Sequence, residues 1–316
     1  MTDEEEQSKY LRLVHFSPLR YPGGKAKLAG FMKAVIEVNG LHDCDYVEPY
    51  AGGAGIAIEL LLHEYVQHIH INDVSRPVFA FWRSVLENTE EFTRLMRNTP
   101  LTVESWKRQK SILNNQDDYD DLELGFATFF LNRTNRSGLL NGGVIGGQDQ
   151  TGPWKIDARF NRAALIARVE AIARLRRRIS LYREDAADFL KGAVKDFPLK
   201  TLIYLDPPYY RKGKELYYDY YNHDDHVQIA ALVKKSLKNR RWIVSYDDTP
   251  QIRELYSRFA HVVYQIGYSA RDVRRGSEIM FLAPGLRVPS ITGSMLHRVG
   301  GRPAGRGFDN ARSASS

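Results

Sequence analysis

The sequence of 316 residues contains one cysteine, Cys44, and no long apolar stretch. A single thiol cannot form a disulfide within the chain or a cysteine-cluster zinc site, so both are excluded. A membrane-spanning helix needs about 18 or more apolar residues in succession, and no segment provides them. The acidic start, Met1–Gln7, does not fit a secretory signal peptide. We therefore expect a soluble, cytoplasmic protein with no membrane partner.

Two common nucleotide-binding signatures are also missing. The phosphate-binding pattern G-x-x-x-x-G-K-[ST] does not occur, and a dinucleotide fingerprint read from Gly53 and Gly55 has Ile58 in place of its last glycine. A nicotinamide oxidoreductase is therefore disfavoured. His223 and His226 lack cysteine or carboxylate partners at metal-ligand spacing, so we expect no bound metal.

The charge balance favours a polyanionic partner. The formal net charge is +7 and the isoelectric point is about 9.3, which suits a nucleic acid. This support is modest, because many soluble proteins are mildly basic. The length is sufficient for one large α/β domain and a smaller second domain.

Apolar strands alternate with amphipathic helices along most of the chain, which predicts an α/β fold. The expected strands are Tyr46–Glu48, His68–Asn72, Ile179–Arg183, Thr201–Leu205, Arg241–Tyr246, His261–Ile266 and Glu278–Leu282. The expected helices include Lys25–Val38, Ser75–Glu87 and Asp224–Leu237. This order predicts a mainly parallel sheet with helices on both faces. A final antiparallel hairpin is expected because no helix separates the last two strands.

A segment at 90–178 interrupts this alternation and is predicted to be an inserted, mainly helical domain. Its expected helices are Ser105–Asn114, Asp121–Thr134 and Asn161–Arg178. A glycine-rich loop between the last two carries a hairpin-turn signal at Asn141-Gly142. The other predicted parts are a tail at 1–18, a catalytic domain formed by 19–89 and 179–285, and a disordered basic tail at 286–316.

The tetrapeptide Asp206-Pro207-Pro208-Tyr209 follows the apolar strand Thr201–Leu205 and is the strongest chemical signal. The prolines end the strand and turn its carbonyl groups outward. An acid, a carbonyl oxygen and a flat ring then lie together, and such a set can bind an exocyclic amine on a planar heterocycle. The alternative is an ordinary strand-to-loop turn.

A glycine-rich turn, Glu48–Gly55, lies upstream between a short strand and an apolar helix. Its glycines allow the backbone to approach a ligand closely. Asp73 follows the next strand, 18 residues after Gly55, and an acid at about this spacing suits the hydroxyls of a ribose. Each half alone is ambiguous, because the turn can be a tight connection and Asp73 a helix cap. In this order they favour a nucleoside cofactor.

With these motifs in this order, the chain resembles the Dam-type adenine-N6 DNA methyltransferases between Leu19 and Pro284. The matching elements are Tyr21-Pro22-Gly23-Gly24-Lys25, the glycine turn, Asp73, Phe129–Gly138, Asp185, the tetrapeptide and Ile243–Pro250. In the last of these, Tyr246 and Asp247 depart from the usual Asn-His, which affects the support of the site. The resemblance implies a Rossmann-like methyltransferase sheet with an antiparallel final strand, and an inserted domain that recognises DNA.

The resemblance also implies which residues form the site. Catalysis is assigned to Asp206, Pro207, Pro208 and Tyr209. S-adenosylmethionine is expected at Tyr21, Lys25, Glu48, Tyr50, Gly52, Gly53, Gly55, Asp73, Asp185 and Asp206. Contacts with DNA are expected from Asn132, Arg133, Asn135, Arg136, Ser137, Arg211, Lys212 and Lys214, since amides and cations can hold bases and phosphates. Some of these residues could instead cap a helix.

The predicted reaction is methylation of the adenine N6 amine in double-stranded DNA. Asp206 and the Pro207 carbonyl would accept its two N–H bonds, while the base is flipped out of the helix. Direct displacement then needs no covalent enzyme intermediate. Two alternatives remain open: methylation of an RNA amine such as guanine N2, and a catalytically inactive DNA-binding module. The enzyme is expected to act as a monomer on DNA, with a restriction endonuclease as a possible partner.

Overall fold

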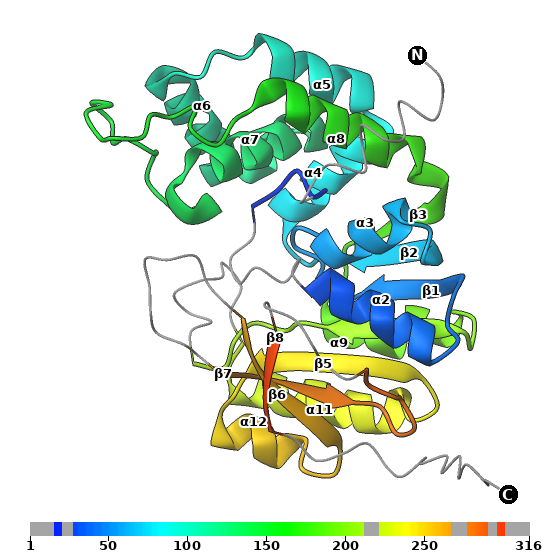
Figure 1. Cartoon of the computed structure of the whole chain (residues 1–316). Helices are drawn as coiled ribbons and strands as arrows, with labels where there is room; N and C mark the ends of the chain where they lie inside the picture. The colour runs from blue at the N-terminus through cyan, green and yellow to red at the C-terminus, as the bar shows by residue number, and fades with distance from the viewer. Residues whose placement is uncertain (1–15, 21–27, 212–220, 267–276, 290–295, 301–316) are drawn as a thin grey trace, which may run out of the picture.

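The computed structural model describes residues 16–20, 28–211, 221–266, 277–289 and 296–300 (Figure 1). A twisted sheet with flanking helices forms one lobe, and a bundle of helices forms a second lobe beside it. Tyr21, Lys25, Lys212 and Lys214 of the predicted site lie outside the described residues.

The sheet has eight strands in the order β3-β2-β1-β4-β5-β7-β6-β8. Their bounds are β1 (Cys44–Glu48), β2 (Val66–Asn72), β3 (Ile179–Tyr182), β4 (Thr201–Leu205), β5 (Arg241–Asp247), β6 (Ala260–Ile266), β7 (Ser277–Leu282) and β8 (Leu296–Gly300). The first five strands in this order pair in parallel. β7 runs antiparallel between β5 and β6. The predicted α/β fold and the final antiparallel hairpin are confirmed.

The strand order reverses between β1 and β4. From β1 the chain moves through α3 (Gly55–Leu62) to β2, and from β4 it moves through α11 (His223–Ser236) to β5 on the other side. Right-handed crossovers in opposite directions place these helices on opposite faces of the sheet. α2 (Ala29–Val38) packs against α3, and α9 (Ala186–Lys191) packs against α11. Both faces of the parallel strands are therefore covered (Figure 1).

The helical lobe has its own aromatic core. Its helices are α4 (Arg76–Glu87), α5 (Thr89–Asn98), α6 (Val103–Asn114), α7 (Asp121–Thr134) and α8 (Arg162–Arg174). Phe81 of α4 lies 6.2 Å from Phe129 of α7, which in turn lies 5.3 Å from Phe160, measured between ring centres. The segment predicted as an inserted domain at 90–178 thus shares its core with α4, which we had expected to belong to the catalytic domain.

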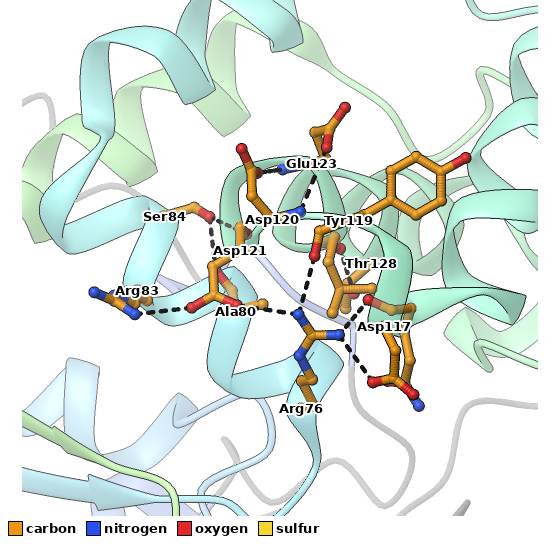
Figure 2. Close-up of polar contacts among 12 residues, drawn as sticks. Arg76, Ala80, Arg83, Ser84, Asp117, Tyr119, Asp120, Asp121, Glu123 and Thr128 are labelled. Atoms are coloured by element: carbon orange, nitrogen blue, oxygen red, sulfur yellow. Dashed lines mark hydrogen bonds and ion pairs between the residues drawn. The ribbon is translucent and has the colours of Figure 1, made fainter.

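Polar contacts fix α4 against the start of α7, as Figure 2 shows. Asp120 and Glu123 form a reciprocal capping box at the first turn of α7. Arg83 donates a hydrogen bond of 3.0 Å to Asp121, and the Ser84 hydroxyl donates one of 2.8 Å to the Asp121 carbonyl. Arg76 donates to the Tyr119 carbonyl at 3.0 Å. These contacts set where the two helices meet, so that their apolar faces can close.

Two details differ from the sequence prediction. Asn141-Gly142 does not connect two strands; its loop is held by a single antiparallel bridge between Asn135 and Val144. The expectation of disorder from residue 286 onward is wrong for two parts of the tail, because Leu286 is buried and Leu296–Gly300 forms β8. β8 pairs with the outer edge of β6, whose backbone N–H and C=O groups would otherwise lack partners and can accept a strand of almost any composition.

Within the described ranges, every helix is too short or too polar to cross a lipid bilayer.

The contact between α4 and α7 depends on Gly125. A Cβ atom there would lie 2.5 Å from the Ala80 carbonyl oxygen and 2.5 Å from the Ser84 hydroxyl. Gly125→Ala should therefore lower the free energy of unfolding by about 1–3 kcal/mol, as overpacking of a closed interior does. Denaturant unfolding of the two proteins measures this difference.

Gly30→Ala in α2 is the matched control. Nothing lies within 4 Å of a Cβ atom at Gly30, so alanine should stabilise the helix by about 0.5–1 kcal/mol. Equal unfolding midpoints for Gly125→Ala and the wild type would show that α4 and α7 do not pack this closely.

Candidate functional site

The glycine turn and the tetrapeptide Asp206–Tyr209 lie side by side because β1 and β4 are parallel neighbours. Val47 pairs with Ile203, so the residues after Glu48 and the residues from Asp206 onward follow the carboxyl ends of two neighbouring parallel strands. Two acids thus emerge at the point where the strand order reverses, which is where sheets of this kind bind ligands.

The conformation of the glycine turn is fixed by hydrogen bonds to Asp73 and Trp82. Gly52 and Ala54 have positive φ angles of 47° and 44°, and the turn leads into the first turn of α3. The Gly52 N–H donates to Asp73 at 2.8 Å, and the Ser75 N–H donates to the same carboxylate at 3.0 Å. The Trp82 indole donates to the Gly52 carbonyl at 2.9 Å. Asp73, predicted from spacing alone, therefore does lie against the glycine turn.

Glu48 is a buried acid between the turn and the tetrapeptide. Only 4% of Glu48 is exposed, and the Ala57 N–H donates a hydrogen bond of 3.1 Å to it. Burial raises the pKa of Glu48 to about 8; the hydrogen bond from Ala57 opposes this rise, and the charge of Asp206 adds to it. A cationic ligand group placed here would stabilise the ionised form of Glu48.

Asp206 is fixed by the neighbouring strand β5. The Ser245 hydroxyl donates a hydrogen bond of 2.7 Å to the Asp206 carboxylate, and the Tyr204 hydroxyl lies 2.7 Å from the same Ser245 oxygen. Ser245 is fully buried, whereas Asp206 is half-buried. Ser245 thus fixes the orientation of the Asp206 carboxylate, and the sequence analysis did not single out this contact.

Tyr209 is fixed through its hydroxyl group by a buried acid on β7. The hydroxyl donates to Glu278 at 2.8 Å, and Tyr264 of β6 donates to the other oxygen of Glu278 at 2.8 Å. Glu278 is 3% exposed and Tyr209 is 7% exposed. The sequence analysis did not single out Glu278. A single acid in the mainly apolar strand Ser277–Leu282 could have indicated a buried carboxylate with a specific partner.

Asp247 holds the backbone that follows the tetrapeptide. Its carboxylate accepts hydrogen bonds from the N–H groups of Tyr210, at 2.8 Å, and Arg211, at 3.0 Å. Asp247 is one of the two departures from the family pattern. The other, Tyr246, is buried and contacts His226 at 3.1 Å through its hydroxyl. Asp247 therefore holds the backbone after the tetrapeptide, and Tyr246 packs inside the protein against α11.

Tyr50 and Tyr221 link the glycine turn to the far end of the loop after the tetrapeptide. Their hydroxyl groups are 3.1 Å apart. Burial raises the pKa of Tyr221 to about 12, and the nearby charges of Asp185 and Asp73 add to this rise. Asp185 itself caps α9 by accepting from the Ala187 N–H at 2.8 Å, so the helix-cap role applies here. Its role toward a cofactor stays a prediction.

Three of the predicted DNA contacts are buried at the end of α7. Asn132 accepts from the Arg20 N–H at 2.7 Å and donates to the Arg20 carbonyl at 2.8 Å. Arg133 donates to the Pro18 carbonyl at 2.6 Å. Asn135 accepts from the Trp106 indole at 2.6 Å. Because these polar atoms are used inside the protein, the geometry favours a structural role for the three side chains rather than base contact.

The remaining DNA contacts within the described chain are exposed. Arg136, Ser137 and Arg211 face solvent, and Ser137 has a left-handed φ of 56°. Val74, next to Asp73 in the sequence, is an exposed apolar side chain. The described residues contain no group of three His, Cys, Asp or Glu side chains that could hold a metal ion.

The raised pKa of Glu48 predicts a stability that falls as the pH rises. The folded protein keeps a proton on Glu48 up to about pH 8, whereas the unfolded chain releases it near the ordinary pKa of about 4.3. Between these values the folded state binds more protons, so the free energy of unfolding decreases with pH. Glu48→Gln should remove this decrease, which is on the order of a few kcal/mol. Denaturant unfolding from about pH 5 to 8.5 measures it.

Glu91→Gln on the surface of α5 is the control and should follow the wild type at every pH, because Glu91 is exposed. Parallel curves for the wild type and Glu48→Gln would mean that Glu48 is not a buried, protonated acid in the folded protein.

Comparison with known proteins agrees with this geometry. The family model of the D12 class N6 adenine-specific DNA methyltransferases matches residues 21–268. None of the curated proteins matches the sequence. Among solved structures, the chain is similar to protein LPL1258 from Legionella pneumophila, with 11% identity, a TM-score of 0.31, and coverage of 83% of this chain and 86% of that one.

A second similar structure is the rRNA methyltransferase AviRa from Streptomyces viridochromogenes, with 13% identity, a TM-score of 0.33, and coverage of 89% of this chain and 92% of that one. These similarities are too low to support an argument, and the fold assignment rests on the strand order. The family match covers more than half of the chain and includes both motifs of the site. The resemblance to adenine-N6 methyltransferases is thereby confirmed, and S-adenosylmethionine is the methyl donor that this membership implies. The chain belongs to the D12 class of N6 adenine-specific DNA methyltransferases.

Proposed function

We propose that this enzyme methylates the N6 amine of one adenine in a specific double-stranded DNA sequence, after the target base has flipped out of the helix. The observation that carries the proposal is the fixed carboxylate of Asp206, held by Ser245 beside the glycine turn. Flipping is needed because an amine inside the duplex cannot reach Asp206 at the carboxyl end of β4.

The residues present fit S-adenosylmethionine. Asp73 lies against the glycine turn, where it can accept ribose hydroxyls. Glu48 is a buried acid whose raised pKa would fall beside a positive charge. Within the described chain, we propose that the cofactor is held by Glu48, Tyr50, Gly52, Gly53, Gly55, Asp73, Asp185 and Asp206. When bound, it supplies a methyl group activated by a positively charged sulfur.

The chemistry assigned to the protein is hydrogen bonding and positioning. Adenine N6 is a poor nucleophile because its lone pair is delocalised into the ring. Asp206 and the Pro207 carbonyl accept its two N–H bonds and so draw the nitrogen toward a tetrahedral arrangement. Positioning of this kind supplies much of the rate enhancement. The only cysteine, Cys44, is buried at the opposite end of β1, which is consistent with direct displacement.

Tyr209 is proposed to stack on the flipped adenine. Its hydroxyl bond to Glu278 fixes the orientation of the ring. Little of the ring is exposed in the protein alone, so stacking requires that neighbouring side chains give way when the base enters. Pro208 completes the turn that separates the acid from the ring.

Contacts with DNA are proposed for the exposed residues Arg136, Ser137 and Arg211, and for Lys212 and Lys214. The positively charged side chains that follow the tetrapeptide in the sequence suit phosphate groups. Action as a monomer on DNA and a restriction endonuclease partner in the same system stay predictions.

Asp206→Ala should abolish methyl transfer without unfolding the protein. The variant loses the hydrogen-bond acceptor for N6, and removal of one such group at a reacting centre costs about 10²–10³-fold in rate or more. Transfer of label from S-adenosylmethionine to duplex DNA, followed by nucleoside analysis for N6-methyladenine, measures the loss.

Asp196→Ala provides the control, because Asp196 is an exposed acid on the protein surface and should retain full activity. Circular dichroism confirms folding of both variants. Substantial N6-methyladenine from Asp206→Ala would overturn the assignment of the acid.

Ser245→Ala should lower kcat by about 10–100-fold and leave the KM for DNA nearly unchanged. The expected size follows from the loss of a hydrogen bond to a charged group, about 1.5–3 kcal/mol. Steady-state kinetics with saturating cofactor separate the two constants. Ser111→Ala, at an exposed position, should match the wild type, and an unchanged kcat for Ser245→Ala would show that Asp206 needs no support from β5.

A further inference from the structure

Three arginines lie near the short segment 17–20, which itself contributes a fourth. We name these four residues the arginine cluster: Arg20, Arg133, Arg159 and Arg168. Arg133 of α7 donates to the Pro18 carbonyl at 2.6 Å, and Arg168 of α8 reaches the Ser17 carbonyl at 3.4 Å. Two guanidinium groups from different helices thus converge on adjacent residues. Arg20 belongs to the same segment and donates to the Asn135 carbonyl at 3.2 Å.

Among the described residues, the positive charges of the cluster have no carboxylate counter-charges. In the described part of the chain, none of the four forms an ion pair with a carboxylate, whereas Arg76, Arg83, Arg97 and Arg178 each do. The Nε atom of Arg168 is buried and has no hydrogen-bond partner among the described residues.

Like charges in the cluster act on one another. Burial, followed by the charges of Arg168 and Arg20, lowers the pKa of Arg133, and burial with the charge of Arg159 lowers that of Arg20. The guanidinium groups still remain charged at neutral pH. Partly buried cations without counter-charges are costly unless an anion binds beside them.

The arginine cluster lies between the glycine turn and the turn at Arg136–Gly138. The Ser17 hydroxyl donates to the Gly53 carbonyl at 2.5 Å, so the segment that the arginines surround lies on the glycine turn. A Cβ atom at Gly138 would lie 2.8 Å from the Arg20 carbonyl oxygen, which places Arg20 against the exposed turn at Arg136–Gly138. Arg159 lies over the ring of Trp154, which is 62% exposed.

We propose that the arginine cluster binds phosphate groups of the DNA backbone next to the flipped adenine. Planar guanidinium groups match phosphate oxygens and tolerate partial burial. The ligand class follows from the excess of positive charge without ion-pair partners among the described residues, and the location from the contacts with the glycine turn and the helical lobe. The proposal rests on the proposed action on double-stranded DNA.

The test is the salt dependence of DNA binding by the full chain. Affinity for a short duplex is measured by fluorescence anisotropy between about 50 and 200 mM KCl for Arg20→Gln, Arg159→Gln and Arg168→Gln. Each lost phosphate contact should reduce the slope of log Kd against log salt concentration by about 0.9. Arg168→Lys keeps the charge and should retain most of the wild-type slope.

Arg177→Gln is the matched control, since it removes the same charge from an exposed arginine at the amino end of β3, the edge opposite the site. Its slope should differ from the wild type by less than that of any cluster variant. Arg159 is exposed, so its variant remains informative if substitution of a buried arginine impairs folding.

Two results would overturn the proposal. Unchanged slopes for all cluster variants would limit the arginines to holding segment 17–20. Weaker binding of a non-reactive cofactor analogue, with unchanged slopes, would assign the cluster to the carboxylate of the cofactor. Formation of N6-methyladenine by the wild type is scored separately, so that failure of the proposed function is distinguishable from failure of the cluster.

Discussion

The parallel pairing of β1 with β4 is the constraint on which the rest of the site depends. These strands belong to opposite halves of the sheet, since β2 and β3 follow on one side and β5 on the other. From the carboxyl end of β1 the chain turns toward β2 on one side of the sheet. From the carboxyl end of the neighbouring β4 it turns toward β5 on the other side. The glycine turn after β1 and the tetrapeptide after β4 meet there, which places Glu48 and Asp206 close enough to affect each other's charge.

The turn Asp206–Tyr209 is supported mainly by strands beyond β4. Ser245 of β5 orients Asp206, Asp247 of β5 holds the following backbone, and Glu278 of β7 anchors Tyr209. Asp247 and Glu278 are opposite each other in the antiparallel pair of β5 and β7. The insertion of β7 between β5 and β6 thus brings the buried acid Glu278 against the hydroxyl group of Tyr209. Three neighbouring groups fix the turn before any ligand binds, and such preorganisation favours a reaction that depends on positioning.

Much of the fold could be predicted from the sequence, because parallel strands buried on both faces have continuous apolar runs such as Thr201–Leu205. The glycine turn and Asp73 were also predictable, since their spacing reflects one strand–helix–strand unit. The buried supports were less accessible: Ser245 and Glu278 gain their roles from strand neighbours that are distant in the sequence. Asn132 and Asn135 show the converse case: both are buried, and residue chemistry suited to DNA does not reveal whether a side chain faces outward. The strand β8 was missed because pairing to a free edge leaves little trace in composition.

A crystal structure with a duplex oligonucleotide and a non-reactive analogue of S-adenosylmethionine would show directly whether Asp206 binds the target amine. We expect a flipped adenine whose N6 lies within hydrogen-bonding distance of Asp206 and the Pro207 carbonyl, with the analogue between the glycine turn and Asp73. An adenine that remains stacked in the helix, or a pocket at Asp206 filled by the protein's own side chains, would contradict this expectation.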